Sequence, residues 1–150
     1  MKRASTVLLA AGGACLALSM AFSAVSAGNP VEDRQATMKA VGQSMKEAAG
    51  INTPATFDAA KAKTLMDGVA ANAKKLHGLY PAGSDKDAKT EADPKIWQNK
   101  ADFDKRLSEM GALATAAGKT TTAETFKPAY AAVGATCKSC HDVYRMKKKS

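Results

Sequence analysis

Apolar residues recur at intervals of three and four positions in four segments of the chain, a spacing that is typical of amphipathic helices. The first segment predicts a helix over residues 32–49, with Met38 and Met45 on its apolar face. The second predicts a helix that begins at the N-cap Thr56 and ends near Gly78.

A long loop separates the second segment from the third. Residues 80–93 begin with Tyr-Pro-Ala-Gly-Ser-Asp and continue with further charged residues, a composition that is typical of turns. Asp93 then offers an N-cap, and Pro94 stands in the first turn of the next pattern. We therefore predict a third helix that begins there and ends at Gly118.

The fourth segment predicts a helix that begins in a capping box. Thr121 and Glu124 have the required spacing, and the apolar pattern continues from there to Tyr144. Pro128 lies inside this pattern and lacks the N–H that an inner helical residue donates. We therefore expect a kink at Pro128 or a helix that begins only at that point.

The whole pattern predicts an all-α protein, because no segment alternates in the manner of a strand. Four amphipathic helices with mostly short connections pack most simply as an antiparallel four-helix bundle, inclined at about 20° to one another. The inward faces are rich in alanine, and only 5% of the chain is aromatic. Such a core has room for an apolar prosthetic group.

The N-terminus has the pattern of a secretory signal. After a basic start, residues 4–27 are uncharged and largely apolar, and small residues end this stretch at Ala27. We expect residues 1–27, with Cys15, to be removed on export. One domain over residues 28–150 would then remain in the periplasm, with no stable insertion in a membrane.

Exported protein is expected to begin at Gly28, because signal peptidase cleaves after small residues of the kind that precede it. N-terminal sequencing of the exported protein checks this prediction. A chain that still begins at Met1 would contradict it.

The charge of the chain is positive but mixed in sequence. Lys and Arg number 22 against 14 Asp and Glu, a formal net charge of +8, and loss of Lys2 and Arg3 with the signal lowers it to +6. The lysines are interleaved with acidic residues except in residues 147–149. This pattern is typical of a solvated surface, and we expect no nucleic-acid partner for an exported chain.

The two cysteines outside the signal lie in one pentapeptide, Cys137-Lys138-Ser139-Cys140-His141. Residues three apart on a helix are neighbours at roughly 5–6 Å, so both thiols can form thioethers along one porphyrin edge. His141 projects about 100° further round the helix, toward the iron. This is the attachment pattern of haem c, and we predict one covalent haem c held by Cys137 and Cys140, with His141 as an iron ligand.

Three other chemistries use the same residue types. A thioredoxin-like thiol pair belongs at a strand-to-helix junction, whereas the surroundings here are helical. A zinc site needs four ligands, and only His141 and the distant His77 join the two cysteines. A disulfide between Cys137 and Cys140 would close a very short loop and stabilise little.

The helical pattern, with its haem motif near the C-terminus, resembles the class II cytochromes c, the cytochrome c-prime family. Four short segments carry the resemblance in order: residues 34–38 (Arg-Gln-Ala-Thr-Met), residues 80–85 (Tyr-Pro-Ala-Gly-Ser-Asp), residues 94–97 (Pro-Lys-Ile-Trp) and residues 133–145 around the haem motif. The resemblance covers nearly all of the chain after the signal, and it implies the same fold and cofactor.

The resemblance also implies a sixth iron ligand. In this family, a first-helix residue four after the arginine lies over the distal haem face, and here that residue is Met38. Methionine there is typical of the low-spin, six-coordinate cytochrome c-556 type, whereas a non-ligand residue gives five-coordinate, high-spin iron.

From the residues alone, several side chains compete for that role, because thioether sulfur and imidazole both bind haem iron well. The competitors are Met38, Met45, Met66, Met110 and His77. Met146 follows His141 by only five residues, too close in the chain to reach the opposite haem face.

Four further residues match family positions at the haem edge. The resemblance implies that Arg34 and Gln35 hold the propionates, that Glu91 lies near the same edge, and that Arg145 lies near the proximal histidine. An independent physical argument supports Arg34, since a guanidinium pairs bidentately with a carboxylate.

The leading functional hypothesis is an electron carrier, not an enzyme, whose iron is held by His141 and Met38. Its partners would be redox proteins with acidic docking patches, and the resemblance implies that two copies can form a homodimer. The alternative is a protein that binds nitric oxide or carbon monoxide at an open distal site. A peroxidase is the least favoured hypothesis, because no distal His-Arg pair stands near Met38 in the sequence.

Overall fold

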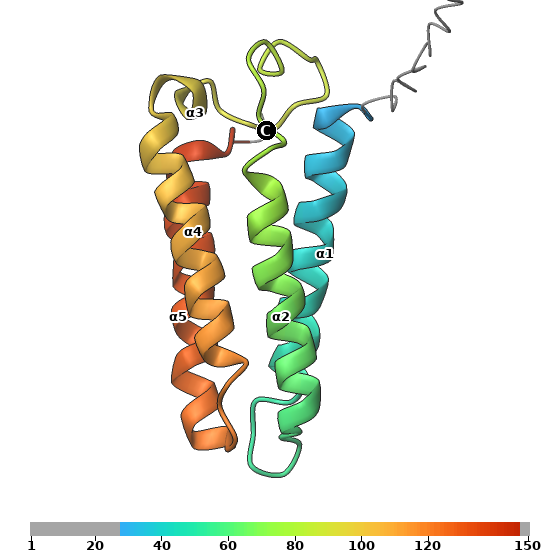
Figure 1. Ribbon diagram of the computed structural model, residues 1–150, viewed down its shortest axis with the longest axis vertical. Coiled ribbons are helices and arrows are strands. Elements are labelled where there is room, and N and C mark those ends of the chain that lie inside the picture. Colours follow the sequence, from blue (N-terminus) through green and yellow to red (C-terminus); the bar gives the residue numbers. More distant parts are fainter. Residues whose placement is uncertain (1–27, 148–150) are drawn as a thin grey trace, which may run out of the picture.

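The computed structural model describes residues 28–147, so the expected signal segment lies outside the described residues. Four long helices run side by side along the molecule, and a fifth, short helix lies at one end of them (Figure 1). The helices are α1 (Pro30–Gly50), α2 (Ala59–Leu76), α3 (Lys95–Gln98), α4 (Lys100–Ala117) and α5 (Ala123–Tyr144). This architecture confirms the predicted antiparallel four-helix bundle.

The first helix begins where local chemistry favours it. The Asn29 side chain accepts a hydrogen bond from the Val31 N–H at 2.9 Å, and Pro30 occupies the first turn, where its missing N–H costs nothing. Glu32 and Asp33 lie in that same turn, where negative charge favours the helix dipole. The helix therefore starts two residues before the apolar pattern indicated.

Two predicted N-caps are wrong by one or two residues. The N-cap of α2 is Asp58, whose carboxylate accepts from the Lys61 N–H at 2.9 Å, whereas Thr56 belongs to the preceding turn. The N-cap of α5 is Thr122 rather than Thr121. In both cases two residues with capping side chains stand one or two positions apart, so the sequence pattern does not choose between them.

The predicted third helix is divided in two. Asp93 does accept from the Lys95 N–H at 2.9 Å, but the helix that follows ends at Gln98, and Asn99 is non-helical (φ −132°, ψ 53°). The break turns Ile96 into the core, where it is 1% exposed. No glycine or proline marks the break, which is why the apolar pattern alone missed it.

Helix α5 runs without interruption through Pro128, so the expected late start is wrong. Pro128 is in the second turn of this helix, where its ring forfeits a single backbone hydrogen bond. The helix keeps its place because Phe126 and Val133 on either side are fully buried.

The long helices do not pack equally around the bundle. Helix α2 packs closely against α1 and α4, and α4 packs closely against α5, whereas α1 and α5 make few contacts with each other. The space between α1 and α5 is what remains open inside the bundle. No helix between residues 28 and 147 combines the length and apolarity that a membrane span requires.

Candidate functional site

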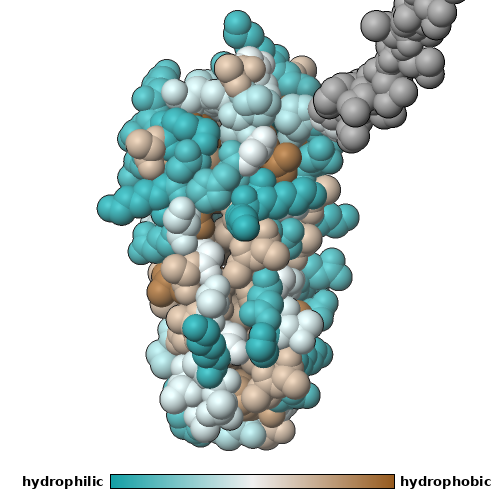
Figure 2. All heavy atoms as spheres, viewed as in Figure 1, coloured by the Kyte–Doolittle hydropathy of each residue, from teal (hydrophilic) through white to brown (hydrophobic). Residues whose placement is uncertain are grey.

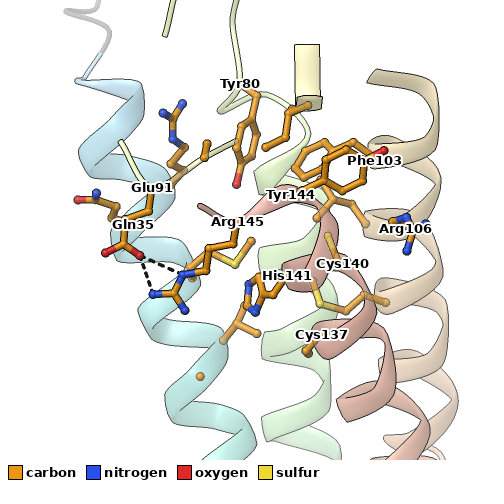
Figure 3. A pocket seen from close by; sticks show the side chains of 18 of the residues that line it. Gln35, Tyr80, Glu91, Phe103, Arg106, Cys137, Cys140, His141, Tyr144 and Arg145 are labelled. Carbon is orange, nitrogen blue, oxygen red and sulfur yellow. Dashed lines mark hydrogen bonds and ion pairs between the residues drawn. The ribbon is translucent and has the colours of Figure 1, made fainter. Parts of the chain in front are cut away.

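A cavity of about 680 Å³ lies between α1, α4 and α5 and is closed at one end by the loop after α2 (Figure 3). Its volume is in the range of pockets that hold cofactors, about 300–1,000 Å³. Much of its wall is apolar; these residues include Val41, Met45, Ile96, Phe103, Leu107 and Met110. A large, flat, apolar group fits such a wall better than a small polar substrate does.

The predicted attachment residues all face this cavity. Cys137, Cys140 and His141 line it from α5 (Figure 3). The two cysteines are not joined to each other. The site therefore has the residues that covalent haem attachment requires on one wall of a cavity of suitable size.

The cysteine thiols are in a desolvating environment. Burial raises the pKa of Cys137, and it raises the pKa of Cys140 to about 11 although the nearby Arg106 opposes the change. Redox-active thiol pairs need the opposite, a thiol pKa near or below neutrality. The thioredoxin-like alternative is therefore disfavoured.

The imidazole of His141 is held in its neutral form. Burial lowers its pKa first and the positive charge of Arg145 lowers it further, whereas Asp142 acts in the opposite direction. Neutral imidazole is the form that binds a metal ion. The cavity wall thus presents the predicted ligand ready for coordination at neutral pH.

Neither the zinc alternative nor His77 finds support. Among residues 28–147 no three His, Cys, Asp or Glu side chains are grouped so as to hold a metal ion. His77 does not line the cavity, and its ring nitrogens lie 3.2 Å from Asp104 Oδ1 and 3.4 Å from Ser108 Oγ on α4. These contacts link the C-terminal end of α2 to α4.

The cavity narrows the choice of a methionine ligand. Met66 is fully buried in the core, Met146 is 39% exposed, and neither lines the cavity. The methionines that do line it are Met38, Met45 and Met110. Met38 lies on α1, across the cavity from α5. Gly42 lies on the next turn of α1, and a Cβ atom placed there would meet no atom within 4 Å beyond its chain neighbours and the backbone of its own helix. Met38 as the iron ligand stays a prediction.

Arg34 has a structural role that the sequence did not indicate. Its guanidinium is only 3% exposed and donates to Leu79 O (3.3 Å), Ser84 Oγ and O (both 2.9 Å) and Thr90 Oγ1. Burial lowers its pKa. Arg34 therefore anchors the loop that closes the cavity while it also lines the cavity itself.

The other predicted edge residues form a clasp, which we define as Gln35, Glu91 and Arg145. Arg145 donates to Glu91 Oε2 from Nε (3.0 Å) and Nη2 (2.6 Å) (Figure 3). Gln35 Nε2 donates to Lys89 O at 2.7 Å. A backbone bridge joins Ala92 to Arg145 beside this pair. The clasp ties the end of α5 to the loop and to α1. The contact of Gln35 with the propionates, the place of Glu91 near that haem edge and the place of Arg145 near His141 stay predictions.

A second polar network, which was not among the sequence-based predictions, fastens α5 to α4. Asp102 accepts from Arg106 Nε at 2.6 Å and from the Tyr144 hydroxyl at 2.7 Å, and Arg106 Nη1 lies 3.4 Å from Ser139 O inside the haem motif. The spacing of Asp102 and Arg106 by four residues was a visible signal of an ion pair. Nothing in the sequence indicated Tyr144 as the third member.

Asp102→Asn is expected to lower the free energy of unfolding at pH 7. Hydrogen bonds from Tyr144 and Arg106 lower the pKa of Asp102 in the folded protein. Such a carboxyl stabilises the fold above its unfolded pKa, about 3.9, and the contribution is lost as the pH falls through the lower folded value. Urea denaturation should show a difference from wild type that shrinks on acidification, whereas Glu109→Gln, elsewhere on α4, serves as the control. A difference that stayed constant with pH would contradict this role.

Comparisons with known proteins agree with this site. The family model described as Cytochrome C' matches residues 29–145. A Rhodopseudomonas palustris protein named cytochrome c' is 39% identical over 127 residues, 83% of this chain and 87% of the relative. An Agrobacterium fabrum protein named cytochrome c-556 is 36% identical over 128 residues, 83% of this chain and 86% of the relative.

A solved structure of cytochrome c' from Rhodopseudomonas palustris superposes on the bundle with a TM-score of 0.75 at 35% identity, covering 82% of this chain and 100% of that one. These matches confirm the resemblance seen in the sequence and the expected cofactor, one covalent haem c. The chain belongs to the cytochrome c' family.

Proposed function

We propose that this protein is a periplasmic electron carrier in which Cys137 and Cys140 hold haem c covalently while His141 and Met38 ligate its iron. One observation carries the proposal: the cavity is lined by the three motif residues from α5 and by a thioether from α1 on another wall. Bound haem c supplies an iron that gains and loses one electron.

The chain's own residues suit that task. Cys137 and Cys140 are three residues apart on one rigid helix, which fixes the attachment edge, and neutral His141 offers a nitrogen ligand. A methionine ligand is soft and tends to raise the reduction potential. With ligands on two helices of one bundle, oxidation and reduction need little rearrangement, and much of the wall around the site is apolar.

The partner that we propose is a redox protein with an acidic surface. Hydrophilic side chains cover much of the end of the bundle that holds the cavity (Figure 2). Lys39, Arg106 and Arg145 line the cavity with a single acidic residue, Glu91. Such charge steers association more than it strengthens the complex, so the association rate should fall as salt is added.

Gas binding is the second candidate, and two observations favour it. Both the cytochrome c' and the cytochrome c-556 of other bacteria are similar to this chain at nearly equal identity. In addition, the open space beside Gly42 lies next to Met38 along the cavity wall. A small gas would find room there if Met38 did not ligate the iron.

An optical spectrum of the oxidised holoprotein distinguishes the electron carrier from the gas-binding protein. Methionine ligation predicts a low-spin spectrum with a weak near-infrared sulfur-to-iron band, together with slow or weak binding of carbon monoxide after reduction. A high-spin spectrum at neutral pH with rapid carbon monoxide binding would reject the carrier and favour the gas binder.

A homodimer is the assembly that we propose. One solved relative, 33% identical with a TM-score of 0.71, is described as a cytochrome c' with ligand-controlled dimer dissociation. Sedimentation of the holoprotein over a range of concentrations tests the assignment, and a single monomeric species at all concentrations would reject it.

A further inference from the structure

Tyr80 lies in the loop that closes the cavity, and its ring is held in the cavity wall by contacts on several sides. Its side chain is 8% exposed, and its ring meets Phe103 edge-on at 4.6 Å and Trp97 at 6.1 Å between centroids. The Arg34 guanidinium lies over the same ring, 5.0 Å from its centroid. With contacts on several sides, the ring has little freedom to turn its hydroxyl elsewhere.

The Tyr80 hydroxyl differs from those of the other two tyrosines. Tyr130 donates to Met45 O at 3.1 Å, and Tyr144 donates to Asp102 Oδ2 at 2.7 Å. The Tyr80 hydroxyl points into the cavity (Figure 3), and we find no acceptor for it among residues 28–147. This hydroxyl is unpaired within the described residues and opens onto the cavity, so it is available to an acceptor on the group that occupies the cavity.

The surroundings of this hydroxyl indicate the kind of acceptor. Burial raises the pKa of Tyr80 to about 12, so the hydroxyl stays protonated at neutral pH and acts as a donor. Arg34 gives this part of the wall a positive charge with its guanidinium buried beside the ring. Positive charge and a free donor together suit an anionic oxygen.

We propose that the Tyr80 hydroxyl donates a hydrogen bond to a propionate carboxylate of the bound haem. The propionates carry the only oxygen atoms of haem c, and this inference rests on the proposed attachment at Cys137 and Cys140. A donor to the ionised form of a carboxyl lowers its pKa. Tyr80 is thus a positioning residue that keeps the propionate ionised and extends the pH range over which the reduction potential is constant.

Other charged groups face the same cavity and act on the same carboxylate. They are Arg34 and Lys39 on α1, Glu91 in the loop, Arg106 on α4 and Arg145 after α5. All of them are retained in a Tyr80→Phe variant, so a change in that variant reports the hydroxyl alone. Tyr130→Phe is the matched control, because it removes a half-buried tyrosine hydroxyl that does not line the cavity.

The experiment measures reduction potential against pH for the holoprotein and both variants. In Tyr80→Phe the potential is expected to begin its pH dependence about one pH unit higher than in wild type, since the propionate loses a donor and its pKa rises. Resonance Raman spectra should also show a shifted propionate bending band. Tyr130→Phe should match wild type in both measurements, and far-UV circular dichroism confirms that both variants are folded.

Coincident potential curves and unshifted Raman bands for Tyr80→Phe and wild type would overturn the proposal. That outcome is separable from failure of the proposed function. Protein purified from a cytochrome c assembly host with no covalent haem would reject the attachment, whereas coincident curves in protein that carries haem reject the role of Tyr80 alone.

Discussion

A Cys137→Ala, Cys140→Ala double variant is expected to leave a cytochrome c assembly host with no covalent haem. Both thiols line the cavity and neither is paired with the other, so no second pair of cysteines among residues 28–147 can replace them. Acid-acetone extraction should leave haem with the wild-type polypeptide and remove all of it from the variant, because coordination by His141 alone does not survive acid. The expected loss is complete rather than graded.

Ser139→Ala is the matched control for the double variant. Ser139 lies between the two cysteines, and its hydroxyl donates to Thr136 O at 3.1 Å on the exposed side of the helix. This change alters the same turn of α5 but keeps both thiols, so haem attachment should remain normal. Covalent haem in the double variant, or its loss in Ser139→Ala, would contradict the assignment of these two residues.

The sequence predicted the helices because a period of 3.6 residues is a local property. It failed at Asn99, where the break in the third helix has no glycine or proline to mark it. The break depends on tertiary contacts: Ile96 packs into the core, and Trp97 Nε1 donates to Pro81 O at 3.0 Å. Contacts with a distant loop leave no trace in the periodicity of the helix itself.

The haem motif was predictable for a similar reason. Cys137, Cys140 and His141 stand within five residues, so helical spacing alone places them on one wall. The clasp was not predictable, since Glu91 and Arg145 are 54 residues apart and their ion pair depends on how the loop returns to α5. The family resemblance placed these residues near the haem, but only the structure shows that Glu91 and Arg145 form an ion pair with each other.

Arg34 shows most clearly which properties of the site the sequence could not predict. The sequence alone predicted that the Arg34 guanidinium pairs with a haem propionate, because a guanidinium pairs bidentately with a carboxylate. In the folded protein its donors go to backbone and hydroxyl oxygens of the closing loop, with Ser84 alone accepting two hydrogen bonds. The buried guanidinium therefore holds the closing loop in place in addition to giving the cavity wall a positive charge. It also lies over the ring of Tyr80 and restricts its position.

Met38→Leu is expected to convert the oxidised protein from low spin to high spin. Leucine has a similar size and no ligand atom, so the bundle should survive at a cost below about 1.5 kcal/mol. Carbon monoxide should bind rapidly to the reduced variant, because no thioether has to leave first. The reduction potential should fall, since a ligand that favours the ferrous state is gone. Optical spectra, flash photolysis and a potentiometric titration measure the three changes.

Met110→Leu and Met45→Leu are the controls that give the Met38 result its meaning. Both methionines line the same cavity, so each substitution makes a similar change in packing while leaving Met38 in place. Both controls should remain low-spin if Met38 is the ligand. A Met38→Leu variant that stayed low-spin would contradict the assignment, and whichever control then turned high-spin would identify the true ligand. His77 would not be the next residue to test, because its ring contacts Asp104 and Ser108 away from the cavity.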